Sequence, residues 1–267
     1  LLHARLPDMV ALAHKRGLRT EMTSNAMLLT SSLAERLVAA GLDQLTVSID
    51  GASDEAHGAI RPGASLEAIT TNVRTIHRLS AEASATPLLI GIEFVAMKRN
   101  VHHLPGLREI AWRVGASFIL VTNVLPYTAE LQDEILYNLG PVSYEGDGSP
   151  DDPLWILPHM DWNRETQEPL ARIMRLQPKW SFLDIRMNQR NNHCPFVMTG
   201  SMAVAWHGGV SPCPALLHSY RCFIRGRKKV FNRCEFGRLP GKSLLEIWLD
   251  PEYAAFRGRV RAFAGLW

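Results

Sequence analysis

The first 123 residues alternate between helical and extended patterns, and this alternation constrains the fold more than any other feature. Apolar residues at helical spacing are followed repeatedly by short runs of β-forming residues. Parallel strands joined by helices produce such a rhythm, so we predict an α/β fold, either a partial barrel or an open doubly wound sheet. The predicted strands are LRTEMTS, LTVSID, LLIGIEFVAM and SFILVTN, which begin at Leu18, Leu45, Leu88 and Ser117.

Capping signals mark several of the predicted helices. Ser32 and Glu35 have the spacing of a capping box, which predicts a helix that begins there and stops at Gly41. Ser65 is the predicted N-cap of a long amphipathic helix. Apolar spacing predicts a further helix over residues 103–114.

Composition excludes several classes of protein. Hydrophobic residues make up 46% of the 267 residues and charged residues 21%, which argues against disorder. The net charge is +3, and the basic residues of 221–238 have few aromatic neighbours that could stack on bases, so we interpret them as a solvated loop. No apolar run approaches the roughly 20 residues that cross a bilayer, and the first residues do not resemble a signal peptide. We therefore expect a cytoplasmic protein that binds neither nucleic acid nor membrane.

Polar side chains follow the first two predicted strands. Ser24 and Asn25 end the first strand, and Ser48 and Asp50 end the second. Because parallel strands end at a common rim, these groups favour one polar ligand, although capping of the following segments explains them equally well. Glu93 lies within the third predicted strand and is either a ligand contact or the partner of an arginine.

All four cysteines lie in the last third of the chain: Cys194, Cys213, Cys222 and Cys234. In a cytosolic protein this favours ligation of a metal or cluster over a disulfide framework. A zinc site made by all four is one alternative, although the spacing of Cys222 and Cys234 matches no zinc pattern. We interpret those two as buried or unused thiols. The segment between Cys194 and Cys213 predicts a hairpin that turns at residues 207–209.

The stretch from Thr23 to Ile76, TSNAMLLTSSLAERLVAAGLDQLTVSIDGASDEAHGAIRPGASLEAITTNVRTI, resembles the central part of the barrel of radical S-adenosylmethionine (radical SAM) enzymes. The resemblance implies two turns that contact S-adenosylmethionine and an arginine for its carboxylate. The residues that match these positions are Ser24, Asn25, Ser48, Asp50 and Arg61. Ala26 replaces the glycine usual in the first turn, and alanine tolerates fewer backbone angles.

The spacing C-x13-G-x4-C, from Cys194 through Gly208 to Cys213, resembles the opening of the SPASM module. The stretch SLLEIWLDPEYAAFRGRV resembles the part that follows in that module. SPASM proteins bind auxiliary 4Fe-4S clusters, so the resemblance implies that Cys194 and Cys213 are cluster ligands. It also implies a division into a partial radical SAM barrel over 1–123, a connecting region over 124–192 and a truncated SPASM-like module over 193–267.

The C-x3-C-x2-C motif that holds the catalytic 4Fe-4S cluster of the family is absent, as are the later SPASM cysteines. We expect a chain cut at both ends that is inactive by itself. The resemblance implies that the intact enzyme cleaves S-adenosylmethionine reductively and generates a 5'-deoxyadenosyl radical.

Within the family, the sequence is most similar to maturases of the cofactor of tungsten-containing aldehyde ferredoxin oxidoreductases. This implies a protein or peptide substrate, with the tungsten enzyme as the candidate, and an electron donor such as ferredoxin or flavodoxin. One alternative is a maturase of ribosomal peptides or of another protein. Another is a non-catalytic remnant that binds S-adenosylmethionine or a partner.

Overall fold

The fold was obtained as a computed structural model. It describes residues 1–83, 87–136, 154–157, 160–175, 180–182, 194–224 and 226–262. The chain divides into two compact units, the first over Leu1–Val124 and Glu134–Ile185 and the second over Leu125–Asp133 and Arg186–Trp267. Of the predicted connecting region over 124–192, residues 137–153, 158–159, 176–179 and 183–192 lie outside the described residues. Within the described ranges, no helix is both long and apolar enough to cross a membrane.

The first unit is built on a six-stranded sheet in the order β1-β2-β3-β4-β5-β6. All neighbouring strands are parallel, which confirms the predicted βαβ architecture. The two last strands were not predicted, because segments of four and three residues are too short to show periodicity. The strands are β1 (Glu21–Ser24), β2 (Gln44–Ser48), β3 (Leu89–Ala96), β4 (Phe118–Asn123), β5 (Leu154–Leu157) and β6 (Trp180–Phe182).

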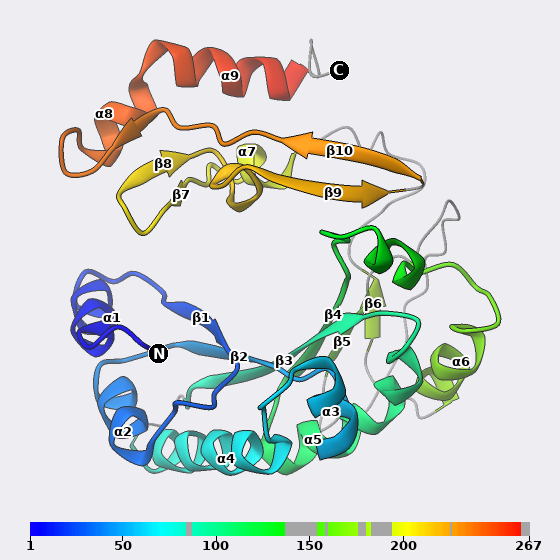
Figure 1. Ribbon diagram of the computed structural model, residues 1–267. Helices are drawn as coiled ribbons and strands as arrows, with labels where there is room; N and C mark the ends of the chain where they lie inside the picture. Colours follow the sequence, from blue (N-terminus) through cyan, green and yellow to red (C-terminus); the bar gives the residue numbers. More distant parts are fainter. Residues whose placement is uncertain are drawn as a thin grey trace. The chain divides into compact units, whose positions relative to one another are not determined.

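Helices cover one face of this sheet, and Figure 1 shows α2, α4 and α5 along it. The apolar stripe of α4, with Ile69, Val73 and Ile76, is buried in the same core as Val47 of β2 and Ile92 of β3. The opposite face of the sheet carries the polar residues of β2. The helices of this unit are α1 (Leu6–Lys15), α2 (Ser31–Ala39), α3 (Asp54–Ile60), α4 (Leu66–Ala83), η1 (Val101–Gly106), α5 (Leu107–Val114) and α6 (Gln167–Arg175).

The start of α2 differs from the predicted capping box at Ser32. Thr30 is the N-cap, in an extended conformation, and its side chain accepts a hydrogen bond from Leu33 N at 3.3 Å. Residues 30–32 are all hydroxyl residues and hence all good caps. The burial of Leu29, which is 1% exposed, fixes the chain so that Thr30 takes this role.

Of two further helix predictions, one is confirmed and one changes. Ser65 caps α4 as predicted, because its Oγ accepts from Ala68 N at 3.2 Å. The helix predicted over 103–114 is divided into the 3-10 segment η1 and helix α5. Pro105 has no backbone N–H to donate, which disfavours a continuous α-helix there.

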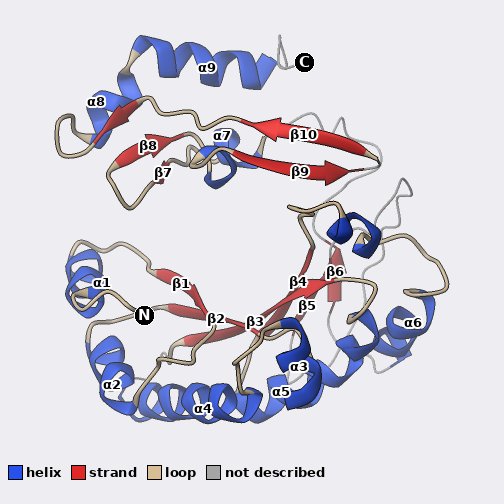
Figure 2. Ribbon diagram, in the orientation of Figure 1, coloured by secondary structure: helices blue, strands red, loops and turns tan. Residues whose placement is uncertain are grey.

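The second unit consists of short antiparallel strands and two helices that follow them (Figure 2). The predicted hairpin is confirmed: β7 and β8 pair with Ala203 opposite Ser211. A small core of Val210, Ile247 and Tyr253 holds the unit together. The elements are η2 (Glu130–Glu134), which ends at the boundary with the first unit, α7 (Pro195–Met198), β7 (Ala203–Val204), β8 (Gly209–Ser211), η3 (Pro214–Leu216), β9 (Tyr220–Ile224), β10 (Arg227–Phe231), β11 (Gly237–Arg238), α8 (Leu244–Leu249) and α9 (Pro251–Ala262).

Candidate functional site

Asp50 is the centre of a hydrogen-bond network just beyond the end of β2. Its side chain is 2% exposed, and its Oδ2 pairs with Arg61 Nε at 2.5 Å. Its Oδ1 accepts from Val95 N at 2.8 Å. Asn100 Nδ2 donates to the carbonyl oxygens of Asp50 and Val95, at 3.2 and 3.0 Å. The network therefore fixes the end of β2 against β3 and places Arg61 beside both.

The turn after Asp50 admits only glycine. A Cβ on Gly51 would lie 2.4 Å from His57 N and 2.6 Å from the carbonyl carbon of Ala56. This close approach lets Asp50 N donate to His57 Nδ1 at 3.1 Å. His57 is wholly buried, and burial lowers its pKa, so the imidazole is neutral with its proton on Nε2. That Nε2 has no hydrogen-bond partner among the described residues.

A polar row crosses the sheet beside this network. Ser48 of β2 lies opposite Glu93 of β3 in the parallel register, so the two side chains share one face. Burial raises the pKa of Glu93, the charge of Asp50 raises it further, and Arg61 opposes both. The charges of Asp50 and Arg61 thus both act on the Glu93 carboxyl. Whether Glu93 contacts a ligand or serves Arg61 stays a prediction.

The turn after β1 has the shape that glycine usually provides. Ala26 has φ of 54°, in the left-handed region, and is wholly buried. Ser24 Oγ accepts from Ala26 N at 3.1 Å, and Asn25 Oδ1 accepts from Met27 N at 3.3 Å. Asn72 Nδ2 of α4 donates to Ala26 O at 3.0 Å and anchors the turn to the helix layer. Local hydrogen bonds therefore hold alanine in this conformation.

The structure brings the predicted residues of both turns to one edge of the sheet. In the parallel pair of β1 and β2, Ser24 lies opposite Val47, so both strands end at the same rim. Arg61 is 34% exposed, which leaves its guanidinium accessible to a ligand. We call this set the polar rim: Ser24, Asn25, Ser48, Asp50 and Arg61. Hydroxyls, an amide and an accessible arginine are able to bind a polar ligand that carries a carboxylate.

Sequence reasoning missed two members of the network around the rim. Asn100 follows Asp50 by 50 residues, and no spacing in the sequence connects them. His57 sits in α3, a short helix that was not predicted because it contains few apolar residues. Gly51, which directly follows Asp50, is the one residue in the sequence that indicates close packing there.

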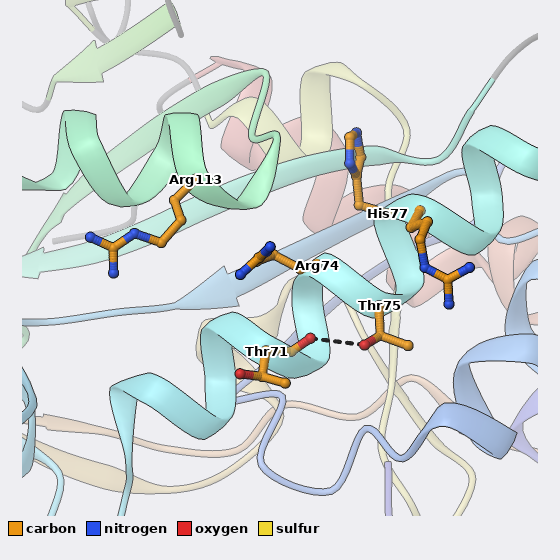
Figure 3. Close-up of a pocket in the computed structure, with 6 residues that line it drawn as sticks. Thr71, Arg74, Thr75, His77 and Arg113 are labelled. Atoms are coloured by element: carbon orange, nitrogen blue, oxygen red, sulfur yellow. Dashed lines mark hydrogen bonds between the residues drawn. The ribbon is translucent and has the colours of Figure 1, made fainter.

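A separate surface groove of about 460 Å³ lies between α4 and α5 (Figure 3). Arg78 pairs with Glu82 and Arg113 with Glu109, each at 2.8 Å. Exposed pairs of this kind contribute about 0–1 kcal/mol and are typical of a solvated helix surface. Its lining does not overlap with the polar rim: Thr71, Arg74, Thr75, His77, Arg78 and Arg113.

In the second unit, Cys194 and Cys213 each precede a short helical turn. Cys194 is the N-cap of α7, and Cys213 is the N-cap of η3. Burial raises the pKa of the Cys213 thiol and the charge of Cys194 adds to this, whereas backbone hydrogen bonds from Leu216 and Ala215 lower it. The two thiols predicted as ligands are therefore electrostatic neighbours. Among the described side chains, no three of His, Cys, Asp or Glu gather as ligands of a single metal ion.

Gly208 makes the turn that leads back to Cys213. Its φ is +86°, and a Cβ would lie 2.4 Å from Leu239 O. Leu239 N in turn donates to Gly208 O at 2.9 Å. Positive φ and close contact both require glycine, which explains this position of the C-x13-G-x4-C spacing.

Comparison with protein families assigns both units. The sequence model of the radical SAM superfamily matches residues 1–95. That of the SPASM iron-sulfur cluster-binding domain matches residues 194–264. Residues 1–95 therefore resemble the radical SAM superfamily, and residues 194–264 resemble the SPASM module. The parallel sheet of the first unit fits the fold of a partial radical SAM barrel.

Individual relatives are more specific. The chain is 29% identical over 96% of its length to the tungsten-containing aldehyde ferredoxin oxidoreductase cofactor-modifying protein of Pyrococcus furiosus, of which it spans 66%. It is 30% identical over 46% of its length to 31% of the PqqA peptide cyclase of Granulibacter bethesdensis. Among solved structures, Streptococcus suis SuiB superposes with a TM-score of 0.62 at 15% identity, over 94% of this chain and 54% of SuiB. The chain thus spans less than two thirds of each of these proteins.

Proposed function

We propose that this chain is part of a radical SAM maturase, with S-adenosylmethionine bound at the polar rim and an auxiliary iron-sulfur cluster in the SPASM module. The observation that carries the proposal is the ion pair of buried Asp50 with half-exposed Arg61, at the shared end of β1 and β2. A cation held at this rim supports the proposal, because the methionyl carboxylate needs a positively charged partner.

Each residue of the rim has a distinct role in this proposal. Arg61 binds the methionyl carboxylate, and Asp50 positions Arg61 instead of contacting the ligand, because both of its oxygens already accept hydrogen bonds within the protein. Ser48 supplies a hydroxyl toward the ribose. Ser24 and Asn25 shape the first turn through their own backbone contacts.

The cysteines fit an auxiliary cluster. Thiolates are the usual ligands of 4Fe-4S clusters. Burial raises the pKa of Cys213, and backbone N–H groups of Leu216 and Ala215 oppose this rise. The cysteines do not fit the catalytic cluster, since no three cysteines of this chain have the spacing C-x3-C-x2-C. That cluster would supply the electron that cleaves S-adenosylmethionine, and the present residues have no ligand to offer it.

The proposed target is the cofactor of a tungsten-containing aldehyde ferredoxin oxidoreductase. Support comes from the Pyrococcus relative, whose name describes modification of that cofactor and whose similarity extends over 96% of the chain. A ferredoxin or flavodoxin is the proposed electron donor. Modification of a peptide is the second candidate, favoured by the similarity of half the chain to PqqA peptide cyclase. A non-catalytic protein that binds S-adenosylmethionine or a partner is the third.

The ligand is tested by calorimetric titration of the chain with S-adenosylmethionine. Arg61→Gln is expected to weaken binding about tenfold or more, since it removes a charge-assisted bond worth about 1.5–3 kcal/mol. Arg74→Gln, in the groove between α4 and α5, is the matched control and should bind as the unchanged chain does. Equal affinities for all three proteins would refute the rim as the binding site.

The target is tested by binding of the iron-loaded chain to immobilised tungsten enzyme lacking its cofactor. Binding to that enzyme but not to ribosomal precursor peptides is expected. Binding to the peptides alone would replace the proposed target with the second candidate.

A further inference from the structure

Cys213 and Cys234 are linked through one short turn of backbone. Leu216 N donates to Cys213 O at 3.1 Å, and Cys234 N donates to Leu216 O at 3.0 Å. Ser211 holds Cys234 from the other side, because its Oγ donates to Cys234 O at 2.7 Å. Ser211 ends β8 and precedes Cys213 by two residues, so both cysteines leave the same corner of the small sheet.

Three of the four cysteines, Cys194, Cys213 and Cys234, differ in exposure from the fourth. All three side chains are partly exposed, as ligands that must receive iron and sulfide need to be. Cys222 differs, since it is wholly buried within β9.

We infer that Cys234 is a third cysteine ligand, beside Cys194 and Cys213, of the auxiliary iron-sulfur cluster. The inference rests on the proposed function and changes the interpretation of Cys234 as an unused thiol. Each thiol loses its proton when its sulfur binds iron. In a 4Fe-4S cluster each cysteine binds a different iron atom, so the ligands need not converge on one point as those of a single ion do.

The backbone around these residues suits a cluster. Ser211 and Leu216 fix the peptide groups of both cysteines before iron arrives, which limits the ordering that binding requires. Val210, which directly precedes Ser211, belongs to the small apolar core that also contains Tyr253. Apolar side chains beside a cluster limit the access of water to it.

The test is anaerobic reconstitution of the full chain with iron and sulfide. Bound iron, acid-labile sulfide and the electron paramagnetic resonance spectrum of the reduced protein are measured for each single Ala variant of the four cysteines. Cys234→Ala is expected to lose iron to the same extent as Cys194→Ala and Cys213→Ala. Cys222→Ala, the matched control, should retain the iron of the unchanged chain.

Cys234→Ser separates ligation from folding, because a serine oxygen is a weaker ligand of similar size. It should keep part of the iron with an altered spectrum, while urea unfolding of the iron-free protein stays unchanged. If Cys234→Ala keeps its iron while Cys194→Ala and Cys213→Ala lose theirs, the inference is wrong and the proposed auxiliary site stands. If none of the variants loses iron, the proposed site itself is refuted.

Discussion

At the scale of single residues, Asp50 has a structural role that its place in the sequence did not reveal. Its two carboxylate oxygens join Arg61 to the backbone of β3. The Asp50 side chain is buried, so water does not reach the carboxylate end of either hydrogen bond. A side chain in this position serves a ligand indirectly, through the arginine it holds.

Two substitutions of Asp50 should therefore reduce the free energy of unfolding to different extents. Asp50→Asn keeps an acceptor for Val95 N but removes the charge opposite Arg61, and we expect a loss of about 1–2 kcal/mol. Asp50→Ala also leaves Val95 N without its partner, so the loss should reach about 2–4 kcal/mol. Urea unfolding measures both. Arg113→Gln, which removes an exposed pair, should cost less than about 1 kcal/mol, and equal losses for all three variants would contradict the assigned network.

Glu93 makes the stability of the fold depend on pH. Its pKa is raised above the ordinary value of 4.5, with burial as the main cause, so the folded state binds the proton more tightly than the unfolded state. The stabilisation that this tighter proton binding gives the folded state is present below pH 4.5 and is lost as pH rises through the raised pKa. Glu93→Gln stays neutral and should gain stability relative to the unchanged chain across that window. Urea unfolding between about pH 4 and pH 8 tests this, and a constant difference would contradict it.

The polar rim illustrates what the sequence reveals at this scale. Ser24, Asn25, Ser48 and Asp50 could be predicted because strand periodicity and parallel pairing fix where strand ends meet. Asn100 could not, because its contacts with the end of β2 arise only from the packing of η1 against the sheet edge, 50 residues later. Local patterns identify which groups end a strand, whereas tertiary packing decides which groups hold them.

At the scale of elements, the start of α2 shows how packing selects among equivalent caps. The sequence Thr30-Ser31-Ser32 offers three hydroxyls, and periodicity alone cannot choose one. The buried Leu29 settles the choice in favour of Thr30. Strand β2, in contrast, could be predicted directly from its alternating pattern and the glycine turn that follows it.

The capping assignment gives a paired test. Thr30→Ala removes the acceptor for Leu33 N and should cost about 1 kcal/mol in the free energy of unfolding. Ser32→Ala lies within the first turn and makes no capping bond, so it should change stability by less than about 0.5 kcal/mol. Urea unfolding of the two variants compares them directly. A larger loss for Ser32→Ala would restore the capping box predicted from the sequence.

At the scale of the whole molecule, the two units differ in how much core each contains. The first unit buries a continuous apolar cluster between sheet and helices, whereas the described core of the second centres on Val210, Ile247 and Tyr253. A small core contributes little stability by itself, and bound metal often supplies the remainder in such modules. The second unit should therefore depend on the proposed cluster far more than the first depends on the proposed ligand.

Amide hydrogen exchange can assign each ligand to its unit. A ligand that binds only the folded form slows local opening near its site. Reconstitution with iron and sulfide should therefore slow exchange over residues 194–262 and leave residues 66–83 of α4 unchanged. S-adenosylmethionine should slow exchange over residues 21–61. The slowing caused by iron and sulfide should vanish in Cys213→Ala, and the slowing caused by S-adenosylmethionine should vanish in Arg61→Gln. If S-adenosylmethionine slows exchange only over residues 194–262, the ligand binds the SPASM module instead of the barrel rim.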